Sequence, residues 1–182
     1  MIPRLQTERL ILRECRPEDF EAFASFMADR DVMRFIHGEA MSRSDAWRTF
    51  AYGIGHWHLR GYGSWAVERK SDGAFMGRVG LVNPEGWPGL EVGWTLGKPY
   101  WGQGYATEAA GRLVAFAFDE LGAQQLAAAW FHDNPASGRV LAKLGCLPDG
   151  TEERACLSRG ANVFCHKVVL KRADFERRKD LQ

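Results

Sequence analysis

The most informative segment of this sequence reads Leu96-Gly97-Lys98-Pro99-Tyr100-Trp101-Gly102-Gln103-Gly104-Tyr105-Ala106-Thr107-Glu108-Ala109. A strand-like run enters a glycine-rich turn, and a helix-like run leaves it. Small residues let a ligand approach the backbone closely, and the N–H groups of a helix's first turn suit a phosphate anion. The segment therefore predicts a pyrophosphate site. Many turns of this kind only cap or pack a helix, so both interpretations stay open at this point.

Two other phosphate-binding motifs can be compared with the sequence. A P-loop is excluded, because no glycine stands before a lysine in the required setting. Gly61-x-Gly63-x-x-Ala66 matches a dinucleotide fingerprint loosely, but it follows a helix-like run and opens a strand-like run, the reverse of the required order. Gly102-x-Gly104 has the right order but places Thr107 where a third small residue is needed. A Rossmann site is therefore disfavoured.

Bulk composition fits one domain over residues 1–182. The chain is 46% hydrophobic, and 24 Lys and Arg against 23 Asp and Glu give a net charge of +1. This balance indicates no nucleic-acid or membrane partner. Residues 1–15 lack a continuous apolar run, so we expect a cytoplasmic protein. The four cysteines are scattered and are expected to be reduced thiols. His56-x-His58 is the one close histidine pair, so we expect no metal.

Hydrophobic periodicity predicts a mixed α/β domain. We expect strands at Leu5–Cys15, Gly63–Lys70, Phe75–Val82, Leu90–Gly97, Gln125–Phe131, Leu147–Glu153 and Asn162–Leu170. We expect helices at Pro17–Met27, Ser42–Gly61, Tyr105–Leu121 and Pro135–Leu144. This gives a mixed, mostly antiparallel sheet of about seven strands with about four helices. The tail, Lys171–Gln182, is charged and expected to be frayed.

Several segments together resemble one family. They are Thr7-Glu8-Arg9-Leu10-Ile11-Leu12-Arg13, Glu91-Val92-Gly93-Trp94-Thr95-Leu96, Tyr100 to Ala109, Asn134-Pro135-Ala136-Ser137, and Leu141-x-Lys143-Leu144-Gly145. Trp101 to Ala106 is similar to the Q/R-x-x-G-x-G/A signature of the GNAT superfamily of N-acetyltransferases, with Trp101 in place of the usual Gln or Arg. The chain resembles the RimJ/RimL branch, the ribosomal-protein N-terminal acetyltransferases, over residues 5–170.

The resemblance implies acetyl-CoA as acyl donor. The sheet would splay between strands four and five, and the pantetheine arm would pair there like a short extra strand. The resemblance implies that the backbone groups of Trp94, Thr95 and Leu96 contact the pantetheine arm. For the side chains of Trp94 and Trp101, packing in the core is an equal alternative to contact with the cofactor. The resemblance also implies a pyrophosphate site formed by Trp101, Gly102, Gln103, Gly104, Tyr105, Ala106 and Thr107. Asn134 would bond the pantetheine arm or simply cap a helix, and Arg139 and Lys143 would meet the phosphates or lie on a solvated face.

For catalysis the resemblance implies Glu91 as base and Ser137 as acid toward the thiolate, by direct attack without a covalent intermediate. The alternatives are a salt-bridged Glu91 and a Ser137 that satisfies local backbone. The acceptor would be a primary amine, of a protein N-terminus or a small molecule. Phe35–Ser44, Trp87 and Leu157–Asn162 would form its pocket. A non-catalytic module that senses acetyl-CoA or acyl-CoA is the other function class, and a homodimer stays open.

Overall fold

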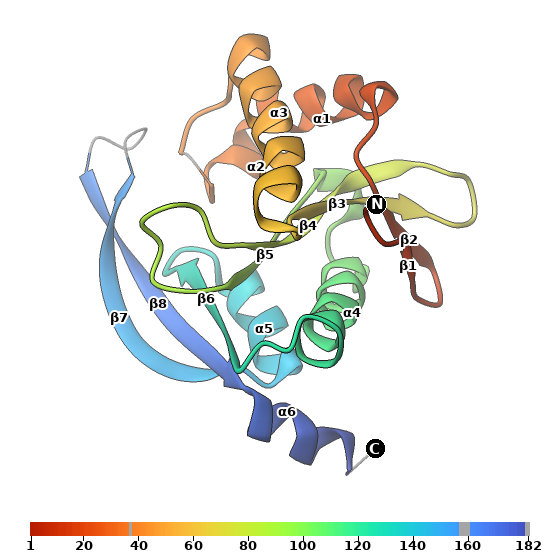
Figure 1. The fold of residues 1–182 in the computed structure, drawn as a ribbon. Coiled ribbons are helices and arrows are strands. Elements are labelled where there is room, and N and C mark those ends of the chain that lie inside the picture. Colours follow the sequence, from red (N-terminus) through yellow and green to blue (C-terminus); the bar gives the residue numbers. More distant parts are fainter. Residues whose placement is uncertain (37, 157–160, 181–182) are drawn as a thin grey trace.

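A computed structural model describes residues 1–36, 38–156 and 161–180 of the chain (Figure 1). Its strands are β1 Leu5–Gln6, β2 Leu10–Arg13, β3 Ser64–Arg69, β4 Phe75–Val82, β5 Glu91–Leu96, β6 Gln125–Phe131, β7 Leu147–Cys156 and β8 Ala161–Lys171. They form one sheet in the order β1-β2-β3-β4-β5-β6-β8-β7. Every neighbouring pair is antiparallel except β5 and β6, which are parallel.

The α-helices are α1 Phe20–Ala28, α2 Arg30–Met33, α3 Arg43–Arg60, α4 Tyr105–Asp119, α5 Pro135–Leu144 and α6 Arg172–Lys179. Capping residues set their ends. The Ser42 side chain accepts a hydrogen bond from the Asp45 N–H at 3.1 Å, and Gly61 ends α3 in the left-handed conformation at φ 74°. The helix predicted from the Ser42 cap to Gly61 is therefore confirmed. A 3-10 turn at Pro17–Asp19 leads into α1.

Helices cover both faces of the sheet, as Figure 1 shows with α1, α2 and α3 on one side and α4 and α5 on the other. The face under α4 holds the larger core, in which Trp65, Val79 and Leu113 are fully buried. The opposite face holds an apolar layer in which Phe23 and Phe50 pack on Ala66. Because side chains alternate along a strand, neighbours such as Trp65 and Ala66 belong to different faces.

The fold class predicted from sequence is confirmed, but one strand and two helices of the structure were not predicted. The expected first strand is two strands, β1 and β2, because the chain turns where the Thr7 N–H donates to the Leu10 carbonyl at 3.0 Å. The sheet therefore has eight strands. Helix α2 was not expected; it is a single short turn, capped by the Asp29 side chain, which accepts from the Asp31 N–H at 2.8 Å.

The expectation of a frayed tail is wrong for Arg172–Lys179, which form α6. Phe175 stacks on Phe118 of α4 with ring centroids 4.8 Å apart. Arg172 donates to the backbone carbonyls of Phe118 and Ala123 at 2.5 and 3.1 Å. One aromatic anchor and two backbone contacts thus fix a helix whose charged sequence gives little sign of packing.

Candidate active site

The strands β5 and β6 separate almost as soon as they meet. In the described part of the chain they share one register pair, Glu91 with Ala127, beside a hydrogen bond of 2.9 Å from the Ala127 N–H to the Leu90 carbonyl. By contrast, β5 pairs with β4 along the whole length of β5. Beyond the Glu91–Ala127 pair, the two facing edges have no partner strand among the described residues, and this opening is here called the splay. The expected splay between the fourth and fifth predicted strands is confirmed.

Backbone alternation shows which groups face the splay. The N–H and C=O of one residue point to the same side of a strand, and successive residues alternate. Because the Leu90 carbonyl points toward β6, the backbone groups of Trp94 do so too, where β6 no longer pairs with them. Those of Thr95 point toward β4, as does the Gly97 N–H, which donates to the Met76 carbonyl at 2.9 Å. Trp94 therefore offers an unpaired backbone edge.

The glycine-rich turn leads from the end of β5 into α4. Gly104 precedes α4 with φ 83°, a left-handed conformation that L side chains adopt only with strain. No side chain caps α4 among the residues that the structure describes, and the first N–H groups of a helix have no partner within it. Residues 101–104 are exposed. The turn thus presents free donors to solvent, as a phosphate site requires.

Side chains within the turn hold its shape. The Trp101 indole N–H donates to the Leu96 carbonyl at 2.8 Å, and the Gln103 side-chain amide donates to the Pro99 carbonyl at 2.8 Å. Trp101 is still 39% exposed, so one side of its ring remains available to a ligand. Trp94 is half-buried and packs against the core. Both interpretations of these tryptophans, packing and cofactor contact, are compatible with these positions.

Thr7 and Arg9 of the N-terminal segment bind Glu108 in the first turn of α4. Glu108 accepts hydrogen bonds from the Thr7 hydroxyl at 2.5 Å, the Arg9 N–H at 2.8 Å and the Arg9 Nε at 2.7 Å. Arg9 also donates to the Gln103 carbonyl at 3.1 Å and lies over the Tyr105 ring at 4.4 Å. Burial alone would raise the pKa of Glu108, but the bonds from Thr7 and Arg9 outweigh it and lower that pKa.

Sequence reasoning gave these contacts no role. Thr7 and Arg9 were noted only as part of a resemblance, and Glu108 only as part of the helix. About a hundred residues separate the two segments, as the contacts record, and no local pattern links them. The one available signal was that both polar segments appeared among the family's motifs. Together they form a group, Thr7, Arg9 and Glu108, here called the clamp.

Helix α5 begins beside the end of β6. Its cap is Asn134, whose Oδ1 accepts the Ser137 N–H at 3.3 Å, with Pro135 in the first turn. The capping interpretation of Asn134 is therefore realised, and its side-chain NH₂ remains available to a ligand. Ser137 is half-buried, while Arg139 and Lys143 lie on the exposed side of the helix. Their predicted contacts with a cofactor stay predictions.

Glu91 lies at the fork of the splay and is 8% exposed. Val92 and Leu96 belong to the core under α4, so Glu91, Gly93 and Thr95 project from the opposite face of β5. Apart from its two chain neighbours, no described residue has an atom within 4 Å of the position that a Cβ on Gly93 would occupy. The face next to Glu91 therefore has open space above the strand, here called the Gly93 gap. A carboxylate at the edge of such a space suits a base that acts on an incoming amine.

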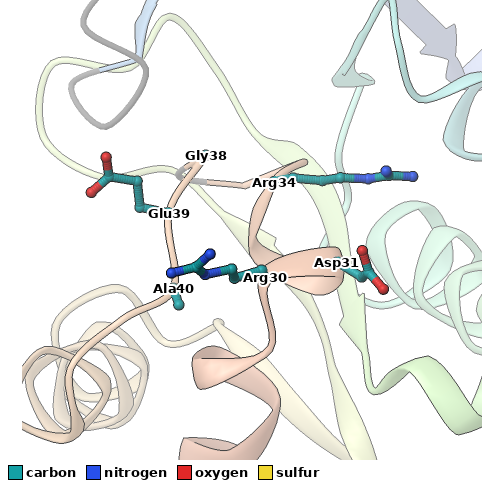
Figure 2. Close-up of a pocket in the computed structure, with 6 residues that line it drawn as sticks. All are labelled: Arg30, Asp31, Arg34, Gly38, Glu39 and Ala40. Atoms are coloured by element: carbon teal, nitrogen blue, oxygen red, sulfur yellow. The ribbon is translucent and has the colours of Figure 1, made fainter.

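A cavity of about 670 Å³ lies at α2 and the loop after it, lined by Arg30, Asp31, Arg34, Gly38, Glu39 and Ala40. Figure 2 shows Asp31 and Arg34 pointing to one side of this segment, and Arg30 and Glu39 to the other. The cavity overlaps the segment expected to form the acceptor pocket. The Asp31 carboxylate bonds the Lys98 ammonium, which ties α2 to the glycine-rich turn. Of the other expected pocket residues, Trp87 is exposed and 157–160 lie outside the described residues.

The described residues contain no group of three or more His, Cys, Asp and Glu side chains that could hold a metal ion. Burial raises the pKa values of the Cys15 and Cys146 thiols to about 11. Thiols of that pKa are protonated at neutral pH and are poor nucleophiles. Within residues 1–36, 38–156 and 161–180, no helix combines the length and apolar character needed to cross a bilayer.

Comparison with known proteins decides the family. The model of the acetyltransferase (GNAT) domain matches residues 9–147, about three quarters of the chain. This protein is a member of the GNAT family. The match spans the splay, the glycine-rich turn, and Arg9 and Glu108 of the clamp, so these features lie within the family's domain. As a GNAT acetyltransferase, the chain catalyses acetyl transfer, and its family uses acetyl-CoA as donor.

Relatives agree with this assignment. The chain is 30% identical over 155 residues to a Bacillus subtilis (strain 168) protein named as the uncharacterized N-acetyltransferase YoaA, across 82% of this chain and 86% of that protein. An acetyltransferase from Agrobacterium tumefaciens C58 shares the fold at TM-score 0.81 and 28% identity, over 93% of this chain and 95% of that one. These names favour an enzyme over the non-catalytic module considered from the sequence.

The fold is also shared with a ribosomal-protein-S5-alanine acetyltransferase from Vibrio fischeri. The TM-score is 0.77, and the alignment covers 95% of this chain and 98% of that one. At 19% identity this likeness concerns the fold alone. It does not assign this GNAT protein to the RimJ/RimL branch.

Proposed function

We propose that this acetyltransferase transfers the acetyl group of acetyl-CoA to a primary amine by direct attack, with Glu91 as general base. The observation that carries the proposal is the splay, with a buried carboxylate at its fork and a helix N-terminus at its open end. A pantetheine arm that pairs with the backbone edge of Trp94 would lead from the glycine-rich turn to the fork. The thioester would then lie near the Gly93 gap.

The reaction needs three events at this point. The amine nitrogen, once neutral, attacks the thioester carbonyl carbon; the C–S bond breaks; and the CoA thiolate takes a proton. Glu91, directly or through a water molecule, would accept the proton that the amine loses. Ser137, in the first turn of α5, would donate to the thiolate. Backbone N–H groups near Trp94 would polarise the carbonyl. No covalent enzyme intermediate is required, and the protonated thiols of Cys15 and Cys146 fit that route.

Proton affinity favours one class of amine. An α-amine with a pKa of about 7.7–8.0 is neutral in roughly a tenth of its molecules at pH 7, whereas a lysine amine near 10.4 is neutral in about one of 2,500. A site with one carboxylate base suits an α-amine or a small amine of low pKa. The motifs that resemble the RimJ/RimL branch support an α-amine, and the V. fischeri fold neighbour is named for an alanine of ribosomal protein S5.

Glu91→Gln tests this proposal, because it keeps the size of the side chain and removes its basicity. We expect turnover to fall at least about thirtyfold, while the Kd for acetyl-CoA from calorimetry barely changes. The defect should shrink toward high pH, where solution supplies more free amine. CoA thiol release over a panel of amines measures turnover.

Glu85→Gln is the matched control. Glu85 is exposed in the loop before β5 and pairs only at the surface with Arg60 at 2.9 Å, so its substitution should leave turnover unchanged. Near-normal turnover of Glu91→Gln from about pH 6 to 9 with a good acceptor would mean that another group or a bound water is the base.

A further inference from the structure

Arg78 is a positively charged side chain in the apolar layer on the acceptor side of the sheet. It lies in the middle of β4, with Ala66 of β3 and Thr95 of β5 as its Cα partners. Its guanidinium carbon is 4.3 Å from the Phe23 ring centroid, and its Nη1 donates to the Thr49 carbonyl at 3.3 Å. The side chain thus reaches from the sheet to α1 and α3, on the face from which Glu91 and Thr95 also project.

Arg78 has no acidic partner among the residues that the structure describes. Arg13, two strands away, shows the usual arrangement: it bonds Asp19 at 2.7 and 2.8 Å and Glu68 at 2.6 Å. Burial lowers the pKa of Arg78, and the nearby Cys15 thiol is neutral because its own pKa is about 11. An arginine cannot escape burial by losing its proton, so its charge stays uncompensated until an anion binds.

The position of Arg78 connects it with the proposed acceptor site. Three register pairs run along one face: Val82 with Glu91, Gly80 with Gly93, and Arg78 with Thr95. The fork, the Gly93 gap and Arg78 therefore follow one another within about 13 Å, four residues of extended strand. Arg78 has an intermediate solvent exposure, so part of its side chain remains accessible to solvent.

We propose that Arg78 binds a carboxylate of the acceptor, so that the preferred acceptors are primary amines that also carry a carboxylate. This inference rests on the proposed function, because it takes the reacting amine to lie beside Glu91. The planar guanidinium fork matches the two oxygens of a carboxylate, and a half-buried site strengthens such a charge-assisted pair. The carboxylate has two sources: a free amino acid, or an acidic side chain close to a peptide's N-terminus.

The experiment compares matched acceptors with the wild-type enzyme. One arm pairs β-alanine, 4-aminobutyrate and 6-aminohexanoate with ethylamine, propylamine and pentylamine, which lack the carboxylate. A second arm pairs C-terminally amidated peptides with Asp or Glu at positions one to three against the same peptides with Asn or Gln. We expect kcat/KM to favour the carboxylate member by at least about tenfold in one arm, which identifies the source. Ratios near one in both arms would overturn the proposal without any variant.

Arg78→Met then tests the residue. Methionine keeps a long apolar stem against Phe23 and removes the cation, so the preference ratio should fall to within about threefold of one. Arg60→Met is the matched control: among the described residues the exposed Arg60 forms its ion pair with Glu85, and the preference ratio of this variant should stay at the wild-type value. A preference that survives in a folded Arg78→Met would overturn the role of Arg78. If Arg78→Met does not fold, Arg78→Lys keeps the charge but loses the fork, and an undiminished ratio would overturn it equally.

Failure of the two proposals can be told apart. If no amine in either arm releases CoA thiol, the proposed function is wrong. If acceptors with and without a carboxylate release CoA thiol equally well, the proposed function stands and only the carboxylate site at Arg78 is rejected.

Discussion

Removing the charge of Glu108 is the sharpest test of how the glycine-rich turn is held. Glu108 is only 18% exposed and accepts hydrogen bonds from the Thr7 hydroxyl, the Arg9 N–H and the Arg9 Nε. In Glu108→Gln the remaining carbonyl oxygen can still accept from Thr7 and the Arg9 N–H, but as a neutral group. The bond from the Arg9 side chain is lost, because the new NH₂ group is a donor.

The cost follows from these contacts. Changing a charge-assisted hydrogen bond to a neutral one loses about 1 kcal/mol, and two such bonds remain. The Arg9 side chain is 43% exposed, so its pair with Glu108 adds only about 0–1 kcal/mol. We therefore expect unfolding free energy to fall by about 2–3 kcal/mol and Tm by about 5–10 °C for a domain of this size. Glu120→Gln, which alters a surface pair between Arg112 of α4 and the residue that follows the helix, should cost almost nothing.

The difference in unfolding free energy between the wild type and Glu108→Gln must also depend on pH, and it must decrease as the pH falls. The folded-state pKa of Glu108 lies below its ordinary value of 4.5, so its stabilisation is full above that pH and is lost as the pH falls through the folded-state pKa. Urea unfolding of the wild type and Glu108→Gln at several values between about pH 7 and 3 should show the difference shrinking on the acid side. A difference that is constant with pH, or below about 0.5 kcal/mol at neutral pH, would refute the reasoning.

Two substitutions test the cofactor and the leaving group. Gly104→Val should weaken acetyl-CoA binding at least about tenfold in calorimetry, because φ 83° strains any L side chain and the turn must shift. Unchanged affinity in a variant with wild-type circular dichroism would remove the turn as the pyrophosphate site. Ser137→Ala should lower turnover about tenfold, with a smaller defect at high pH, since a thiol of pKa about 8.5 needs less protonation there. A defect that is the same at each pH would make Ser137 structural.

Local signals predicted most of the fold. Ser42, Gly61 and Gly145 each set a helix boundary through contacts with neighbours in sequence, so their patterns were sufficient. The tail could not be predicted in the same way. Contacts with residues about fifty positions away, such as Phe175 with Phe118 and Arg172 with the Phe118 and Ala123 carbonyls, make α6 part of the domain. Propensity and periodicity carry no information about a partner at that separation.

The candidate site likewise has features that local sequence could predict and features that depend on distant contacts. The turn at Gly102 and Gly104 was predicted from a local motif, whereas the role of Glu91 as base was predicted from the family resemblance, and both roles stay predictions. Which backbone edge faces the splay depends on the single pair between Glu91 and Ala127, which no pattern in either strand shows. Sequence analysis also gave no reason to select Arg78, because a lone arginine in a strand is typical of a surface residue. Its burial without a carboxylate among its described neighbours is apparent only in the structure.

The clamp explains why two motifs far apart in sequence belong together. A turn that presents free N–H groups to a phosphate cannot use those groups to hold its own shape, so its shape must be held from outside. Glu108 supplies the attachment from within α4, while Thr7 and Arg9 supply it from the segment before β2. Because Arg9 also bonds the Gln103 carbonyl, the clamp reaches the turn itself. A turn held in place before the cofactor arrives loses less conformational entropy on binding, so weakening the clamp should lower affinity for acetyl-CoA as well as stability.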